Sequence, residues 1–325
     1  MTDPLCVDLH SHWLLNGHYL RRRLERLRPD PLALGPLGNR FGLEMALEGH
    51  VHGVAFTAYS PLLSGALALQ DLRAQFRTLR RAAAASEGRL RLVRTGKEVR
   101  EARRDGVVGG FLAVEGGACL ARGIPALEEL ATEGVRMVTL VHFVPNALGD
   151  PGEFPVHPHR GLSPLGRRLV PEMGRRGILP DVAHLCDEGV RQVLDLAEGP
   201  VVCSHTGMRA LCDRPRNLPD DLARGIARTG GLVGILWFPP YLARNPRGVG
   251  LDRVVDHMRH AASVAGPDHV AVGTDLDGWT WPPRGLEGHH RLPALAEALA
   301  RAGFSDAEVQ GILGGNALRV IGDGD

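Results

Sequence analysis

Short apolar runs rich in β-branched residues alternate along this chain with amphipathic helical patterns. The apolar runs predict eight buried β-strands, at Cys6–His10, Val51–Tyr59, Gly110–Glu115, Met137–His142, Ile178–His184, Pro200–His205, Leu232–Phe238 and Val270–Asp275. The helical patterns between them lie at Leu62–Ala85, Ile124–Glu133, Ser163–Gly177, Cys186–Ala197, Asp220–Thr229, Leu251–Ala265 and Leu292–Ala302. Strands that alternate with helices form a parallel sheet, and eight repeats close most simply into a barrel. We therefore predict an α/β fold, a single (β/α)8 TIM-barrel domain over residues 1–325.

Local signals refine this picture at a few places. Ser163 followed by Pro164 is typical of the start of a helix. Leu92–Arg94 could add a short strand, and Phe304–Ile321 predicts a closing pair of helices that Ser305 caps. These segments leave the eight-fold repeat unchanged.

Two connections are too long and too rich in Pro and Gly to be simple turns. Residues 14–49 follow the first predicted strand, and residues 143–162 follow the fourth. Long loops in compact domains usually cover or line a binding site. Because both leave the carboxyl end of a strand, we expect both to lie over the active site.

Several predicted strands end with a side chain that can bind a metal. These side chains are His10, His12, Glu115, His184, His205 and Asp275. Each alone is weak, since a lone histidine after a strand is more often structural, but their joint occurrence at five strand ends favours a metal site. In a (β/α)8 barrel the carboxyl ends of all strands meet at one face, where the active site is built. Four imidazoles and two carboxylates suffice for two divalent ions that share a carboxylate.

The residue types narrow the metal and the chemistry. In His10-Ser11-His12, residues i and i+2 of a strand project to the same side. Glu115 precedes Gly116-Gly117, which would let the backbone turn away and bring its carboxylate between the ions. Imidazole and carboxylate ligands without cysteine suit zinc, with manganese, iron or cobalt as alternatives. Two such ions would hold a bridging hydroxide and polarise a substrate carbonyl, which predicts a metal-dependent hydrolase.

Composition and charge exclude several other classes. The chain has 44% hydrophobic and 23% charged residues and a formal net charge of +1, with no basic block or acidic tail. We therefore expect a small-molecule substrate and neither a nucleic acid nor a membrane as partner. The chain has five cysteines without CxxC spacing, which we interpret as buried reduced thiols. The residues after Met1 do not have the pattern of a signal peptide. Both point to a cytoplasmic protein.

Ordered motifs along nearly the whole chain carry a resemblance to a known family. They are Asp8-Leu9-His10, Val114-Glu115-Gly116-Gly117, Thr139-Leu140-Val141-His142 with Asn146, Gly161-Leu162-Ser163-Pro164-Leu165-Gly166, Glu172-Met173, Asp181-Val182-Ala183-His184, Ser204-His205-Thr206, Arg216-Asn217-Leu218, Gly273-Thr274-Asp275-Leu276-Asp277-Gly278 and Gly315-Asn316-Ala317-Leu318-Arg319-Val320. On these motifs the chain resembles the renal (membrane) dipeptidase family of zinc metallopeptidases, in the amidohydrolase-like superfamily.

The resemblance implies a dipeptidase with two zinc ions in a (β/α)8 barrel. It implies that Glu115 bridges the metals, that His10 and the residue two further on bind one ion, and that His184 and His205 bind the other. For catalysis it implies that His142 contacts the oxyanion, and that Asp275 meets the free amine or relays a proton. For the substrate it implies that Arg216 binds the terminal carboxylate, with Tyr241 and Asn146 also in contact. Family members are commonly homodimers, and many accept a C-terminal D-residue.

One position departs from the family pattern. The family usually has Asp where this chain has His12, so the ligand set loses one negative charge. The His-x-His that results is similar to the opening motif of the wider amidohydrolase superfamily. We expect a retained site with altered affinity or metal preference, and loss of the first metal is the competing expectation.

Three functions therefore compete. The leading one is a metallo-dipeptidase that acts through a metal-bridged hydroxide. A second is an amidohydrolase acting on another amide, a lactone or an ester; many such sites bridge their metals with a carboxylated lysine, but Lys97, the only lysine, ends no predicted strand. A third is a catalytically silent relative that binds a small molecule. His157 and His159, in the second long loop, could also meet a substrate.

Overall fold

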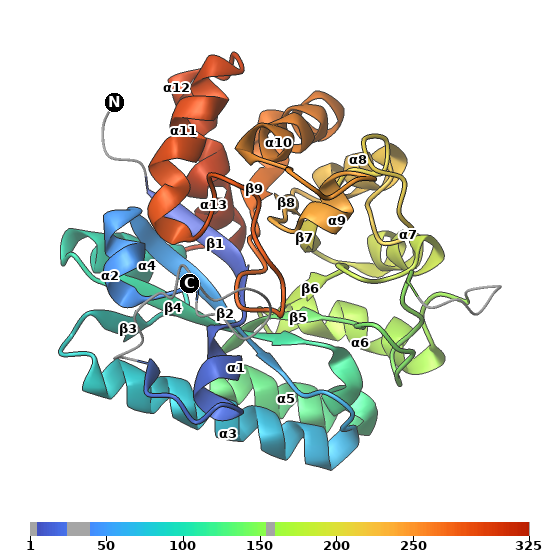
Figure 1. Cartoon of the computed structure of the whole chain (residues 1–325). Helices are drawn as coiled ribbons and strands as arrows, with labels where there is room; N and C mark the ends of the chain where they lie inside the picture. The colour runs from blue at the N-terminus through green and yellow to red at the C-terminus, as the bar shows by residue number, and fades with distance from the viewer. Residues whose placement is uncertain (1–4, 25–39, 154–159, 325) are drawn as a thin grey trace.

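The computed structural model describes residues 5–24, 40–153 and 160–324. Eight parallel strands within these residues close into a barrel surrounded by helices (Figure 1). The sheet has the order β2-β1-β9-β8-β7-β6-β5-β4, and pairing of β2 with β4 closes it. The predicted (β/α)8 barrel is confirmed.

The barrel strands correspond one to one to the eight predicted runs. They are β1 (Cys6–Ser11), β2 (Val51–Tyr59), β4 (Val108–Glu115), β5 (Val135–Thr139), β6 (Leu179–Asp181), β7 (Val202–Thr206), β8 (Leu232–Ile235) and β9 (Val270–Val272). A ninth short strand, β3 (Leu90–Leu92), pairs with the first residues of β4. Several strands end earlier than predicted, because their apolar runs leave the sheet as buried loops that lead toward the carboxyl-end face.

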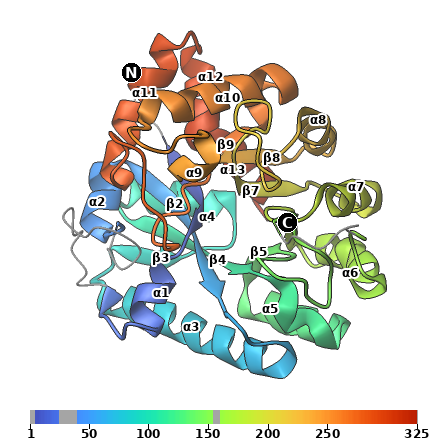
Figure 2. The same ribbon diagram turned by 45° about the vertical axis from the view of Figure 1, so that its right-hand side comes forward.

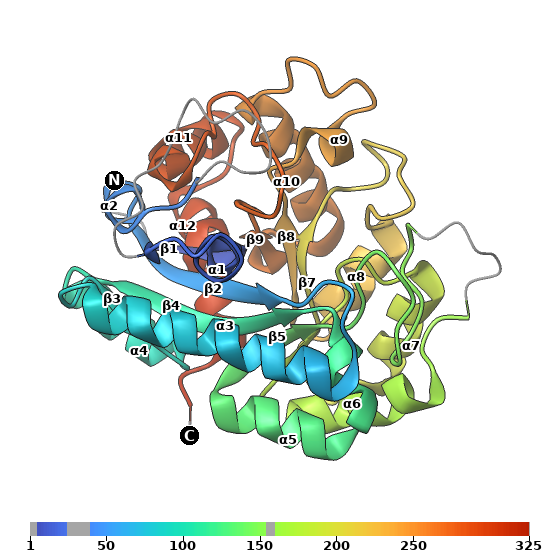
Figure 3. The ribbon, with the colours of Figure 1, turned by 60° about the horizontal axis from the view of Figure 1, so that its bottom comes forward.

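Helices cover the outside of the barrel. They are α3 (Gly65–Ala85), α4 (Gly96–Arg104), α5 (Ile124–Glu133), α6 (Pro164–Arg175), α7 (Asp187–Leu196), α8 (Asp220–Arg228), α10 (Leu251–Ala265) and α11 (Leu292–Arg301). Along one side α5, α6, α7, α8 and α10 follow one another around the barrel (Figure 2). The long helix α3 lies outside β2 and β3 (Figure 3).

The chain closes with α12 (Asp306–Gln310) and α13 (Asn316–Ile321), which a single π-helical turn at Gly311–Gly315 joins into one helical run. The predicted helix pair is thus nearly continuous. Ser305 caps it as predicted, since its hydroxyl accepts from the backbone N–H of Glu308.

The long connection at residues 14–49 is only partly a loop. It begins inside α1 (Trp13–His18) and ends just after α2 (Leu43–Glu48). Trp13 and Leu14 of α1 and Phe41, just before α2, are fully buried in the core, while Leu15 of α1 lines the cavity described below. A further short helix, α9 (Pro239–Leu242), follows β8.

Alternation along the strands separates two cores. Phe111, Met137 and Ala271 belong to a cluster that fills the barrel interior, while their neighbours Leu112, Val138, Val270 and Val272 belong to the cluster that packs against the helices. Glu115 is in phase with Phe111 in β4, so its side chain points inward above this cluster. Among the described residues, no helix is long and apolar enough to cross a membrane.

Candidate active site

The six side chains predicted from strand ends lie together at the carboxyl-end face of the barrel. Glu115, the last residue of β4, is at their centre. Its Oε2 is 3.1 Å from Nε2 of His12, and its Oε1 is 3.2 Å from Nε2 of His184. Nε2 of His205 and of His10 lie 3.5 Å and 3.6 Å from Oε1. The carboxylate therefore has histidines on both of its oxygens.

The four histidines form two pairs. Nε2 of His10 and Nε2 of His12 are 3.0 Å apart, and the same distance separates Nε2 of His184 from Nε2 of His205. Donor atoms bound to one tetrahedral zinc at about 2.1 Å lie about 3.4 Å from each other. The distances within each pair, and from each pair to Glu115, fit two ions with one carboxylate between them.

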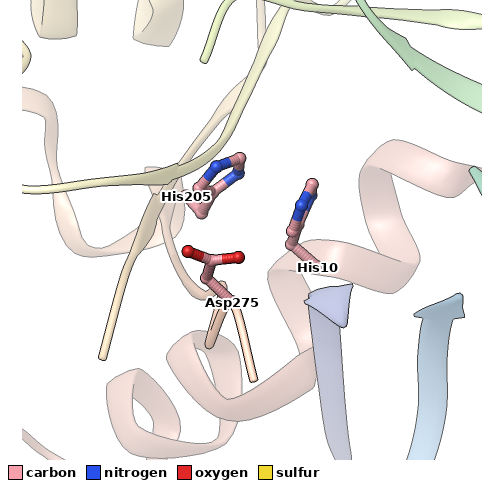
Figure 4. A group of neighbouring side chains, drawn as sticks. All are labelled: His10, His205 and Asp275. Carbon is pink, nitrogen blue, oxygen red and sulfur yellow. The ribbon is translucent and has the colours of Figure 1, made fainter. Parts of the chain in front are cut away.

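Asp275 borders the same cluster from the loop after β9. Figure 4 shows its carboxylate directed toward the rings of His10 and His205, and the ligating atoms of the three lie within 4.8 Å of one another. Its Oδ1 is also 3.6 Å from Nε2 of His12. Asp275 has φ of 58° and His184 has φ of 67°. Left-handed backbone at residues other than glycine is costly and gathers at functional sites.

The backbone turn after Glu115 depends on glycine, as predicted. Gly116 has φ of 82°. A Cβ at Gly117 would lie 2.8 Å from the backbone oxygen of Leu140, so a larger residue would force the backbone to shift.

A buried carboxylate outside the cluster orients part of it. Asp181, at the end of β6, accepts hydrogen bonds from the backbone of Ala183 and Ser204 and from the hydroxyls of Thr139 and Ser204. The Ser204 hydroxyl lies 2.9 Å from Nδ1 of His205. Such partners fix the ring of a ligand histidine so that its other nitrogen is free for a metal.

Glu153 orients the ring of His184 by accepting a hydrogen bond from its Nδ1. The sequence patterns did not identify this residue. Its Oε1 is 3.1 Å from Nδ1 of His184 and 3.3 Å from Nε of Arg216. Arg216 in turn donates to the backbone oxygen of His205 at 2.9 Å. Glu153 thus joins a predicted metal ligand to the predicted carboxylate-binding arginine.

His142 lies on the other side of Glu115. Its Nε2 is 3.6 Å from Oε2 of Glu115, and its Nδ1 is 3.0 Å from the hydroxyl of Tyr59. Burial lowers the pKa of His142 to about 3 and raises the pKa of Tyr59 to about 12. Both side chains are therefore neutral at pH 7.

Burial and the neighbouring carboxylates oppose each other in this cluster: burial lowers histidine pKa values, yet Glu115 and its neighbours raise the pKa of His12 and raise that of His184 to about 9. Burial would raise the pKa of Glu115, but the surrounding histidines, His142 first, outweigh it and hold that pKa well below its usual range. Burial raises the pKa of Asp275 to about 7. Burial also lowers the pKa of His10 and of His205, so both rings are neutral, the form that binds a metal.

Comparison of the whole chain with protein families decides its membership. The family model of the membrane dipeptidases, peptidase family M19, matches residues 37–324. The chain belongs to family M19. This confirms the resemblance drawn from the motifs. The matched residues include Glu115, His142, His184 and His205, whereas His10 and His12 in and after β1 precede them.

Similar proteins support the same membership. An uncharacterized dipeptidase of Schizosaccharomyces pombe (strain 972) is 35% identical over 214 residues, 66% of this chain, and the chain spans only 52% of that relative's length. The crystal structure of the dipeptidase AC, a family M19 metallopeptidase, has 28% identity, a TM-score of 0.88 and 98% coverage of both chains. A metallopeptidase from Rhodobacter sphaeroides, liganded with a phosphinate mimic of the dipeptide L-Ala-D-Ala, has 26% identity, the same TM-score and the same coverage.

A cavity of about 200 Å³ opens in front of Glu115 in this M19 chain. Arg216, Tyr241 and Asp275 line it, as the resemblance implied, and the guanidinium carbon of Arg216 lies 4.9 Å from the centre of the Tyr241 ring. Phe143, from the second long connection, also lines it.

Asn146 makes its hydrogen bonds within its own loop. It is not among the described residues that line the cavity, and its contact with the substrate stays a prediction. Its amide donates to the backbone oxygen of Leu140 and accepts from the N–H of Leu148, so it shapes its own loop. His157 and His159 lie outside the described residues.

Lys97 is exposed in α4, and it is not among the described residues that line the cavity. The M19 site therefore has a glutamate, and not a lysine, in the position between the two histidine pairs.

Proposed function

We propose that this chain is a metal-dependent dipeptidase that works with two zinc ions and accepts dipeptides with a C-terminal D-residue. The observation that carries the proposal is the position of Glu115 between two histidine pairs, at the wall of a cavity that also holds Arg216 and Asp275. Family membership supports the same reaction class.

The residues that would hold the ions are those of the two pairs. His10 and His12 would bind one ion, His184 and His205 would bind the other, and both ions would share Glu115. When bound, the ions would lower the pKa of a water molecule between them and polarise the scissile carbonyl. His12 makes the ligand set one charge less negative than the usual family pattern, but its Nε2 lies where a ligand would.

Cavity residues would bind and orient the dipeptide. Arg216 is buried, so its attraction for a substrate carboxylate is little screened by water, and Tyr241 would pack beside it. Asp275 would contact the free amine or hand a proton to the leaving amine. His142 would donate a hydrogen bond to the carbonyl oxygen as it gains negative charge. The dipeptide mimic bound to the Rhodobacter sphaeroides relative supports an L,D substrate.

The direct test is hydrolysis of a dipeptide panel. Purified protein loaded with zinc, manganese or cobalt is given L,L and L,D dipeptides, together with their C-terminal amides, and the released amino acids are counted. We expect hydrolysis of free dipeptides, and a large rise in KM for Arg216→Ala toward them but not toward the amides. No hydrolysis with any metal would refute the proposal. Hydrolysis only of the neutral C-terminal amides, unaffected by Arg216→Ala, would instead indicate another amidohydrolase.

A cytoplasmic location and a homodimer stay predictions. Sedimentation of the metal-loaded protein would test the second, with a mass near 70 kDa, about twice the 35.0 kDa chain, as the expected result.

A further inference from the structure

Tyr59 lies in the wall of the cavity, and its hydroxyl touches His142. The hydroxyl is 3.0 Å from Nδ1, and the two rings meet edge to face with their centres 4.6 Å apart. In the pairing of β2 with β4, Tyr59 lies opposite Glu115. Phenol, imidazole and carboxylate therefore stand together at one side of the cavity.

The two nitrogens of His142 face groups of different hydrogen-bonding character. A phenol hydroxyl can donate to Nδ1, whereas an ionised carboxylate can only accept. Nε2 lies 3.6 Å from Oε2 of Glu115. A proton on Nε2 would face that acceptor, while a lone pair on Nε2 would face negative charge. The two neighbours together favour the neutral tautomer with its proton on Nε2 and its lone pair toward Tyr59.

Two hydrogen bonds with the side chain of Gln75 hold the backbone of Tyr59. Oε1 of Gln75 accepts from the Tyr59 N–H at 3.1 Å, and Nε2 of Gln75 donates to the Tyr59 carbonyl at 2.7 Å. Gln75 is fully buried in α3. Tyr59 thus lies at the end of a strand, and a helix fixes its backbone. A residue that orients a catalytic side chain needs such rigid support.

We propose that Tyr59 is a positioning residue of the hydrolysis: its hydroxyl keeps the proton of His142 on Nε2, directed at the carbonyl oxygen of the substrate. The proposal rests on the proposed function, in which His142 contacts that oxygen. Removal of an oxyanion donor itself lowers kcat by about 10²–10³. Removal of the group that orients the donor should cost about 10–100-fold.

The kinetic test compares two hydroxyl deletions in the zinc-loaded protein with an alanyl dipeptide. Tyr59→Phe should lower kcat about 10–100-fold, with KM within about threefold because Arg216 and Asp275 remain. Tyr19→Phe is the matched control. Its hydroxyl bonds Asp71 and the Tyr59 carbonyl but not His142, and Gln75 still holds that carbonyl, so kcat should stay within about threefold.

A double-mutant cycle separates positioning from a general structural effect. If Tyr59 acts through His142, adding Tyr59→Phe to His142→Gln should lower kcat no further. A full additional loss, or an unchanged kcat in Tyr59→Phe alone, would overturn the proposal.

A spectroscopic reading is independent of activity. In protein labelled with ¹⁵N-histidine, the ring shifts of His142, assigned with His142→Gln, report its tautomer. We expect the Nε2–H form in the zinc-loaded wild type and a mixture of tautomers in Tyr59→Phe. An Nδ1–H form in the wild type, or no change in the variant, would refute the role of Tyr59. If no dipeptide is hydrolysed at all, the proposed function fails, and this reading still decides whether Tyr59 sets the tautomer.

Discussion

Replacing Glu153 should lower the affinity of the protein for one metal ion and leave its affinity for the other unchanged. Glu153 is the carboxylate behind His184, 3.1 Å from Nδ1, and it also pairs with Nε of Arg216 at 3.3 Å. Neither His10 nor His12 touches it among the contacts of the described residues. The perturbation therefore reaches only one histidine pair.

The size of the effect follows from what each substitution removes. Loss of the partner behind a ligand histidine typically costs about 10–100-fold in metal affinity, which is about 1.4–2.8 kcal/mol. Glu153→Gln keeps an oxygen that can accept from the Nδ1–H of His184 and loses the charge that faces Arg216, so about 10-fold is expected. Glu153→Ala removes the hydrogen bond to His184 as well as the ion pair with Arg216, so the loss should approach about 100-fold. It also leaves the buried Arg216 cation without its carboxylate, which destabilises the fold further.

The assay is zinc competition against a chromogenic chelator, fitted for two ions. In both variants one ion should weaken by the stated factors and the other should keep its affinity. Glu297→Gln is the control, because Glu297 lies on the exposed face of α11 and pairs only with Arg301 among the ion pairs of the described residues. Wild-type affinity for both ions in Glu153→Ala would show that the contact with His184 does nothing for metal binding. An equal loss at both ions would show that the two histidine pairs do not hold separate ions.

Three further predictions concern stability. His257 is buried, with Nδ1 accepting from the Met208 N–H and Nε2 facing the Leu242 carbonyl, and burial lowers its pKa to about 4. As pH falls below the unfolded value of about 6.5, the unfolded chain takes up the proton first, so the free energy of unfolding should drop by about 1.4 kcal/mol per pH unit down to about pH 4. Urea titrations at several pH values should show that the free energy of unfolding falls less steeply as the pH falls in His257→Gln than in the wild type. An identical pH dependence in the two proteins would contradict the argument. Ser305→Ala removes the N-cap of α12 and should lower the free energy of unfolding by about 1 kcal/mol in the same titrations. An unchanged free energy of unfolding would show that the cap does not stabilise the fold. Chelation of the metal should lower Tm and added zinc should restore it, since an ion that binds only the folded chain stabilises it; a Tm indifferent to chelator would argue against bound ions.

The repeat pattern predicts the barrel but not where each strand stops. The apolar run Met137–His142 predicts a strand that reaches His142, yet β5 ends at Thr139, and Leu140 and Val141 are fully buried in a loop. Hydrophobic periodicity reports burial, and a buried loop satisfies it as well as a strand does. The hydrophobic pattern does not predict helix α4. Its start could still be predicted from the sequence, because Thr95 and Glu98 have the spacing of a capping box, which they form in the structure.

The candidate site was predictable where it depends on topology. The barrel brings all carboxyl strand ends to one face, so His10, Glu115 and His205 meet although they are far apart in sequence. Tyr59 also ends a predicted strand, but a phenol does not belong to the imidazole and carboxylate pattern that indicates a metal site, so its contact with His142 becomes visible only in the fold. Glu153 lies in a loop without a periodic pattern, and its partners are distant in sequence, so nothing local identifies it.

The measurement that most directly tests the two-ion site is anomalous diffraction at the zinc edge from crystals of the zinc-loaded protein. We predict two peaks, one beside His10 and His12 and one beside His184 and His205, with a Glu115 oxygen near each. A single peak at His184 and His205, with His12 turned away, would contradict the account.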